Sequence, residues 1–258
     1  MQDKLRIFIV SLKIDLMHMR NSMIKMIINA ISWALPTIVV VTFILPQYGV
    51  GKDFTSLQIA SVIAGVNFFS FHSHLYTLVS KIENKQMSAD LLLPTSIDMI
   101  LLQKVTFFCI YGVVMSVIIF ILAYCIYYSS GMFAQMNILK LLFVIFITSM
   151  AKGLNTLLLA GCIEKMVDIE NIIMRFMFPL WFLGGFQFSW EAILKTSKWF
   201  AYINLLNPYF HEAEMFRSSL LEGKFVPFSL SISVTVIYSI LFWYIAKRQF
   251  KKKLDLPH

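Results

Sequence analysis

Six apolar runs separated by short polar segments dominate the hydrophobic pattern of this chain. The runs are residues 28–46, 57–79, 105–128, 138–162, 176–190 and 226–246. About 20 apolar residues in an α-helix cross the hydrocarbon core of a bilayer, and the run at 176–190 is clearly shorter than that. The pattern predicts an all-α integral membrane protein with six transmembrane helices, forming a single membrane domain over residues 1–258.

Residues 3–27 precede the first run and mix charged with apolar side chains at helical spacing. Leu5, Ile9 and Leu12 recur every three or four residues, and charged residues such as Lys13 stand between them. This spacing predicts an N-terminal amphipathic helix that lies in the membrane interface. A cytoplasmic helix packed on its own protein is the alternative.

Residues 80–104 separate the second and third runs and are too charged to cross a membrane. The charged positions are Lys81, Glu83, Lys85, Asp90, Asp98 and Lys104. Each would cost about 2.5 to 3.5 kcal/mol at the centre of a bilayer, so we expect the segment on the membrane surface. Three leucines follow Asp90, and Pro94 ends any helix before it, because proline disfavours the α conformation of the preceding residue. The segment thus predicts a short amphipathic helix at residues 86–93.

Residues 176–225 combine the short fifth run with a long amphipathic stretch. Gly184 and Gly185 interrupt the run, and the following residues alternate apolar with polar side chains up to Gly223. Broken helices are tolerated at membrane depth only where they are buried in protein or line a cavity. We expect a fifth span that goes most of the way across, followed by re-entrant helices on the outer face before the sixth span.

Composition agrees with a membrane protein, and the charge distribution sets an orientation. The chain is 59% hydrophobic and 14% charged, against about 25% charged residues in an ordinary soluble domain. Of its 22 basic residues, fifteen fall before the first run, in 80–104, in 163–175 or after the sixth run, and five fall in the alternate loops. Basic residues favour the cytoplasmic side, so both termini are expected there. This alternation argues against nucleic-acid binding as the reason for the net charge of +8.

Several kinds of chemistry are not supported by the sequence. Cys109, Cys125 and Cys162 lie in apolar runs, where cysteine behaves as a small apolar side chain, so no disulfide or metal site is expected. Gly51 and Lys52 do not form a phosphate-binding loop, because Pro46 stands where the first glycine is required. ATP binding by this chain is therefore not expected.

The acidic residues fit neither an enzyme nor a proton-coupled carrier. A membrane-embedded lipid transferase needs carboxylate clusters that hold Mg²⁺ and phosphate, whereas the acidic groupings here are the pairs Asp168 with Glu170 and Glu212 with Glu214, on opposite sides of the predicted membrane. A proton-coupled carrier needs a carboxylate within a span. None of the 14 acidic residues falls inside a predicted span.

Two motifs, in order, give the chain a family resemblance. Asp90 is followed by Leu-Leu-Leu-Pro-Thr-Ser and a new apolar run; farther on, Gly184-Gly185-Phe186 is followed by Asn207-Pro208 and by Glu214-Met215-Phe216-Arg217. Together with the leading amphipathic helix, these motifs resemble the permease subunits of type-2 ABC exporters, which move drugs, polysaccharides and lipid-linked glycans. Phe188 to Trp190 depart from the family pattern, because many members have a second proline there.

The resemblance implies a permease subunit that forms the substrate pathway as a dimer and couples to separate cytoplasmic ATPase subunits. Those partners would bind ATP and Mg, whereas this chain would bind no cofactor and would not be an enzyme. A homodimer in the bacterial plasma (inner) membrane is expected, and a heterodimer is also open. The implied coupling residues are Glu83, Gln86, Asp90, Leu92 and Pro94, and the re-entrant motif comprises Asn207, Pro208 and Arg217.

Lys152 and Asn155 of the fourth run are candidates for the pathway. A lysine at a helix centre costs about 2.5 to 3.5 kcal/mol, and Asn155 shares its helical face. The pair predicts a polar stripe that faces a pathway, a dimer interface or a carboxylate such as Glu83 or Glu164; snorkelling of the lysine is the alternative.

Further pathway candidates are Trp181, Phe182, Gly184, Gly185 and Phe186. Aromatic side chains here could hold a sugar or an amphipathic drug, or serve as a belt at the membrane interface. A drug, a lipid and a lipid-linked glycan are all compatible substrates. An immunity or resistance protein, a channel on the same fold, and a membrane-embedded lipid transferase are the alternative functions.

Overall fold

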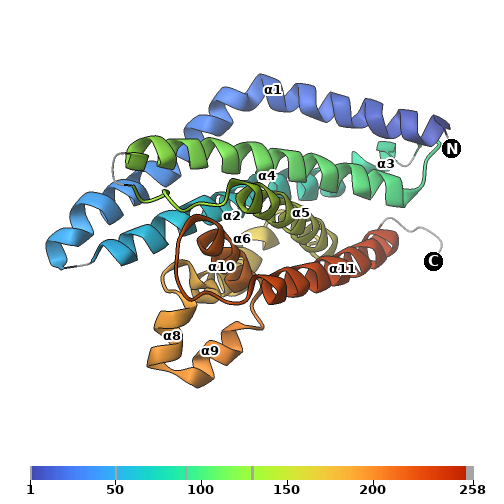
Figure 1. The fold of residues 1–258 in the computed structure, drawn as a ribbon. Helices are drawn as coiled ribbons and strands as arrows, with labels where there is room; N and C mark the ends of the chain where they lie inside the picture. Colours follow the sequence, from blue (N-terminus) through green and yellow to red (C-terminus); the bar gives the residue numbers. More distant parts are fainter. Residues whose placement is uncertain (1, 50, 91, 129–130, 254–258) are drawn as a thin grey trace.

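The computed structural model describes residues 2–49, 51–90, 92–128 and 131–253, in which the secondary structure is entirely helical (Figure 1). Within these ranges, five helical segments are long and apolar enough to cross a membrane: Lys4–Tyr48, Phe54–Glu83, Ile97–Tyr127, Ile138–Cys162 and Phe228–Lys253. A bent helix pair at 168–196 makes a sixth if it is counted as one span.

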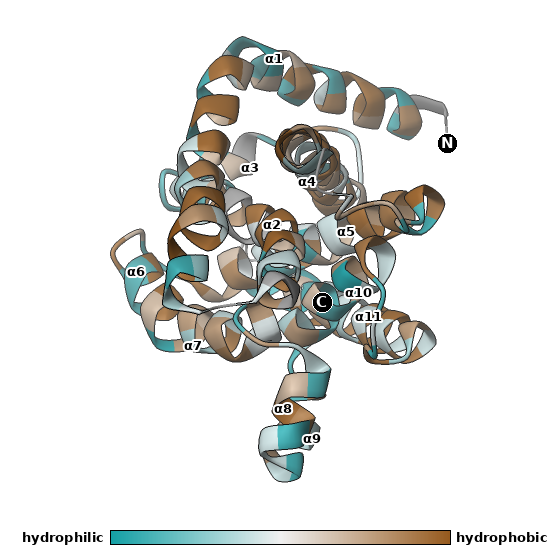
Figure 2. Ribbon diagram, turned by 60° about the vertical axis from the view of Figure 1, so that its left-hand side comes forward, coloured by the Kyte–Doolittle hydropathy of each residue, from teal (hydrophilic) through white to brown (hydrophobic). Residues whose placement is uncertain are grey.

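The predicted interfacial helix and first span form one continuous helix. Helix α1 (Gln2–Val39) continues into a π-helical turn, η1 (Val40–Ile44), and a 3₁₀ turn, η2 (Leu45–Tyr48). Figures 1 and 2 show a bend in α1, which sets its N-terminal part at an angle to the remainder. Residues 4–17 are here called the N-terminal arm. The chain turns back at Gly49, whose φ of 82° is accessible to glycine without steric cost.

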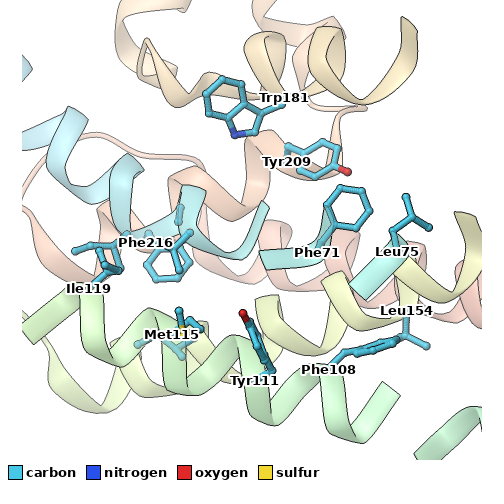
Figure 3. Packing of buried hydrophobic residues seen from close by; sticks show 14 of the residues in the cluster. Phe71, Leu75, Phe108, Tyr111, Met115, Ile119, Leu154, Trp181, Tyr209 and Phe216 are labelled. Atoms are coloured by element: carbon cyan, nitrogen blue, oxygen red, sulfur yellow. The ribbon is translucent and has the colours of Figure 1, made fainter. Parts of the chain in front are cut away.

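Helices α2 (Lys52–Glu83), α4 (Ile97–Tyr127) and α5 (Ile138–Cys162) form the centre of the bundle. Helix α2 is the most buried of the five long segments, and α11 (Phe228–Lys253) packs against α5 at the periphery. Figure 3 shows part of the apolar core, in which Phe71 of α2, Phe108 of α4 and Leu154 of α5 are buried. Helix α5 starts at the cap of Asn137, whose side chain accepts a hydrogen bond from the Lys140 backbone N–H.

The fifth predicted span is a helix with several irregular turns. It comprises α6 (Asp168–Ile172), η4 (Ile173–Met177), α7 (Phe178–Trp181) and η5 (Phe182–Phe186), of which η4 and η5 are π-helical. The helix thus begins before residue 176, and it breaks after 186 with a bend of 93°. Gly185 permits the break, because its φ is 75°.

Three short helices follow the break. The helices α8 (Trp190–Thr196) and α9 (Lys198–Asn204) form a hairpin that protrudes from the body of the protein (Figures 1 and 2). Capping hydrogen bonds to the Ser189 and Ser197 side chains start them. Helix α10 (Pro208–Leu220) then returns into the bundle, where it contacts α2, α5, α11 and η5.

Different chain segments lie at the two ends of the helix bundle. At one end lie the start of α1, the end of α11 and α3 (Met87–Asp90) (Figure 1). The Lys253 ammonium donates hydrogen bonds to backbone carbonyls at the end of α5, and Glu83 accepts one from the Met166 backbone N–H at 3.1 Å. At the other end of α5, the Asn137 N–H donates to the Ser219 carbonyl of α10 at 2.9 Å. Segments 80–104, 163–170 and 247–253 therefore share one end.

Candidate functional site

Helix α10 is the best candidate for a functional centre, because most of its polar side chains are buried. Eleven of its 13 residues are buried. Asn207 caps its start by accepting the Tyr209 N–H, and the Asn207 side-chain amide donates to the Leu180 carbonyl at 2.7 Å. Pro208 fits the first helical position, because the N–H that proline lacks has no partner inside a helix there. The Asn-Pro motif thus attaches α10 to the fifth span.

Lys152 forms a buried ion pair with this helix. Its ammonium lies 2.6 Å from the Glu212 carboxylate, and Lys152 is only 4% exposed. The same ammonium stands 3.5 Å from the centre of the Tyr209 ring, a cation–π contact that adds to the pairing. Asn155, one turn on, donates to the Tyr209 hydroxyl at 2.8 Å. The predicted polar stripe of α5 therefore faces α10.

The structure contradicts two of the possibilities that the sequence left open for Lys152. It does not snorkel to the headgroups, because its ammonium is engaged inside the protein. Its carboxylate partner is neither Glu83 nor Glu164 but Glu212, which lies outside every predicted span and yet packs against the middle of α5. Hydrophobic periodicity gives no signal for this pairing, because the partner is distant in sequence.

Arg217 makes a second buried network at the break in the fifth span. Its side chain is 0% exposed and pairs with the Glu214 carboxylate at 2.9 Å. The guanidinium also donates to the Gly185 carbonyl at 2.5 Å and the Ser61 hydroxyl at 2.7 Å. A further hydrogen bond, to the Phe188 carbonyl at 2.8 Å, lies just beyond the break. Backbone carbonyls that the break releases are thus satisfied by one planar side chain with five donors.

Glu214 fixes the segments on both sides of α10. One carboxylate oxygen accepts the Trp190 N–H at 3.2 Å, and the other accepts the Val226 N–H at 3.1 Å. These bonds attach the start of α8 and the connection to α11. Close packing of α10 against the break also accounts for the glycines at positions 184 and 185. A Cβ on Gly184 would lie 2.7 Å from Tyr209, and one on Gly185 would lie 2.6 Å from Phe210.

His211 fixes the orientation of α10 toward α11. Burial lowers the pKa of its imidazole, which favours the neutral ring. The Nε2 atom lies 2.8 Å from the Leu205 carbonyl, so Nε2 carries the proton and donates. The Nδ1 atom then accepts from the Ser231 hydroxyl of α11 at 3.1 Å.

The aromatic pathway candidates divide into buried and exposed residues. Trp181 and Phe186 are buried and stack with ring centroids 4.9 Å apart. Phe182 is 52% exposed. It is one of five large apolar side chains of the fifth predicted span that are exposed, here called the fifth-span face: Met174, Phe176, Leu180, Phe182 and Leu183. The exposed Arg175 lies among them in the sequence. The Phe182 ring nevertheless contacts Trp181, with ring centroids 4.9 Å apart, so the three rings form one chain of contacts from the exposed to the buried side of the helix.

The segment at 80–104 contains a shorter helix than predicted. Helix α3 spans Met87–Asp90, and bends and turns replace the helix at 92–95; residue 91 lies outside the described residues. Pro94 provides the physical reason, since the residue before a proline avoids the α conformation. Leu92 is 86% exposed, and Gln86 is exposed as well.

Charged residues tie this segment to the N-terminal arm. The Lys104 ammonium of α4 lies 3.1 Å from the Asp15 carboxylate and 4.0 Å from Asp90. The Gln103 amide donates to Asp15 at 2.8 Å. The arm, α3 and the start of α4 thereby form one surface at the end of the bundle that holds Glu83.

Comparison with known proteins identifies the family. The family model described as ABC-2 type transporter matches residues 12–221. The chain belongs to the ABC-2 type transporter family. The matched range includes the surface around α3 and the two buried ion pairs of α10. A search of curated proteins finds no match to the chain.

ABC-2 membership makes this chain a transporter membrane subunit with multiple apolar helices. Membrane subunits of the ABC-2 family work with ATPase partners in general. Among the described residues, no group of three or more His, Cys, Asp or Glu side chains is arranged to hold a metal ion.

Proposed function

We propose that this chain is the permease subunit of an ATP-driven exporter, which forms the substrate pathway as a dimer and receives its driving force from two separate ATPase subunits. The ABC-2 family match over residues 12–221 carries the proposal. ATP and Mg would be bound by the partner chains, so the permease itself would hydrolyse nothing.

The surface around α3 is the proposed docking site for the ATPase. It presents Gln86 and Leu92 outward, while Asp90 and Lys104 connect it to the rest of the chain. Lys104 of α4 pairs both with Asp90 of α3 and with Asp15 of α1, so movement of α3 can reach α1 through this one side chain. ATP-driven movement at the docking site would thereby be transmitted to a helix that can face the pathway.

The charge distribution supports a cytoplasmic position for this surface. The N-terminal arm, the 80–104 segment, the 163–170 connection and the end of α11 share one end of the bundle. Together they carry twelve of the 22 basic residues. Because loops rich in lysine and arginine stay in the cytoplasm, both termini would face the cytoplasm of a bacterial cell, with α8 and α9 toward the outside.

The proposed dimer is favoured by the fifth-span face. Its five large apolar side chains are exposed in one copy of the chain, and a second copy could cover them. A homodimer needs no further chain and is the simplest arrangement.

The docking proposal is tested with Leu92→Asp. Leu92 is 86% exposed, so the substitution should leave the fold intact. Co-purification of the ATPase encoded with the permease should fall at least about tenfold, because a buried unpaired carboxylate at an interface costs well over 1.4 kcal/mol. Leu206→Asp is the matched control, since Leu206 is 71% exposed in the α9–α10 connection. Equal ATPase recovery with both variants would place the docking surface elsewhere.

A further inference from the structure

Helix α11 carries a continuous row of exposed apolar side chains. Figure 1 shows α11 along the edge of the bundle, where it packs mainly against α5 and α10. Away from these contacts, four large side chains recur at helical spacing and therefore share one face. Their exposed fractions run from 48% at Leu241 to 69% at Tyr244. They are here called the α11 stripe: Ile237, Ile240, Leu241 and Tyr244.

Two basic residues continue the same face toward the end of α11. Arg248 follows Tyr244 by about one helical turn, and Lys252 follows by about one turn more, so both lie in line with the α11 stripe. Both side chains are exposed, and neither forms a hydrogen bond or ion pair with another described residue. The outward face of α11 thus changes from apolar to cationic within one turn.

Other basic residues at the end of α11 have partners inside the protein. The Lys247 ammonium lies 2.7 Å from the Asp98 carboxylate at the start of α4. The Lys253 ammonium donates hydrogen bonds to backbone carbonyls at the end of α5. Lys247 and Lys253 therefore fix α11 to its neighbours, which leaves Arg248 and Lys252 directed outward.

The α11 stripe has the length of one leaflet of a bilayer. Arg248 lies eleven positions after Ile237, which corresponds to about 16 Å at a rise of 1.5 Å per residue. Half of the ~30 Å hydrocarbon core is about 15 Å. None of the residues of α11 is acidic, so no carboxylate of this helix repels an anion at Arg248 and Lys252. The face offers an apolar surface to acyl chains and two cations at the depth of the phosphate groups.

We propose that this face of α11 binds an anionic phospholipid, whose phosphate group pairs with Arg248 and Lys252 and whose acyl chains lie along the α11 stripe. The planar guanidinium of arginine suits a phosphate group, because it can donate two parallel hydrogen bonds. Binding requires neither ATP nor a partner chain. Only the leaflet rests on the proposed function, since a cytoplasmic C-terminus places the site in the cytoplasmic leaflet.

The test compares two photoreactive lipids that differ only in the headgroup. Anionic phosphatidylglycerol and zwitterionic phosphatidylcholine each carry a diazirine in one acyl chain. Each is added in turn, at the same low fraction, to phosphatidylcholine nanodiscs that hold the purified full chain. After illumination, peptide mass spectrometry measures the labelling of residues 237–245. The reference is segment 121–126 of α4, in which Ile121 and Ile126 are exposed and whose apolar run contains no lysine or arginine.

The ratio of phosphatidylglycerol to phosphatidylcholine labelling should be about ten- to thirtyfold higher on α11 than on the reference, because each basic residue near the headgroups favours an anionic lipid about fivefold. Arg248→Gln with Lys252→Gln should bring the two ratios within about twofold of each other. Lys85→Gln with Lys165→Gln is the matched control, since it removes the same charge from exposed residues at the same end of the bundle. The control should keep the enrichment.

Equal ratios on the two segments would overturn the lipid site, and so would a control pair that removes the enrichment as fully as the Arg248 and Lys252 pair. Weak labelling of residues 237–245 by both lipids would also overturn it, because protein, such as a second copy of the chain, would then cover the face. Competition by glycerophosphoglycerol, the headgroup without acyl chains, would refute the role of the apolar side chains. ATPase docking is measured separately with Leu92→Asp, so either proposal can fail without the other.

Discussion

Removing the charge of Lys152 should destabilise the fold, because the substitution Lys152→Met leaves Glu212 as a buried carboxylate without its 2.6 Å partner. Methionine keeps the length and apolar stem of lysine, so packing changes little. Breaking a buried ion pair by removing one partner costs about 3 to 5 kcal/mol. For a chain of this size, each kcal/mol shifts the melting temperature by roughly 2 to 4 °C, which predicts a fall on the order of 10 °C.

The assay compares the fraction of monodisperse protein after heating, by size-exclusion chromatography in one detergent. Lys140→Met is the matched control, because Lys140 lies on the same helix and its ammonium donates to the Ser218 carbonyl at 2.7 Å. Loss of a hydrogen bond from a partly exposed charged group costs about 1.5 kcal/mol, so its melting temperature should fall by only a few degrees.

A double variant separates the loss of the ion pair from other effects of the substitution at Lys152. Adding Glu212→Leu to Lys152→Met removes both charges, and replacing a buried pair with apolar residues is often nearly neutral. Most of the lost stability should return, while Asn155 keeps its hydrogen bond to Tyr209. If Lys152→Met has the same melting temperature as the Lys140→Met control, or if adding Glu212→Leu restores none of the lost stability, the ion pair does not stabilise the fold as inferred.

Two further predictions concern the helix break at Gly185 and the orientation of the chain in the membrane. Gly185→Ala should lower the melting temperature by at least several degrees, because its φ is 75° and a Cβ would lie 2.6 Å from Phe210. Gly51→Ala, which meets no atom within 4 Å, should melt within about 2 °C of the parent, and similar shifts for both would contradict a special need for glycine at the break. For sidedness, a cysteine replacing exposed Thr196 should react with an impermeant thiol reagent in whole cells, and one replacing exposed Lys85 should not; labelling of the Lys85 variant would reverse the proposed orientation.

Local patterns in the sequence were sufficient to predict several elements. Helix α5 has the bounds 138–162 of its apolar run, because the run is flanked by a capping asparagine and a polar loop. The interruption at Gly184 and Gly185 also appears where predicted, since glycine adopts the positive φ of position 185 without steric cost. Family membership followed from motifs whose order is visible in the chain, and the family match agrees with it.

The sequence by itself determined that apolar helices form and roughly where they begin and end, because helical hydrogen bonds and apolar periodicity are local. Only the tertiary structure decided the partners of the buried charges. Polar side chains on α10 read as a surface helix, yet Glu212 pairs with Lys152 of α5, and Arg217 binds Ser61 of α2. Because burying an unpaired charge is costly, each of these charges must have a partner. Which residue is the partner depends on which helices pack together, and the sequence alone does not determine that packing.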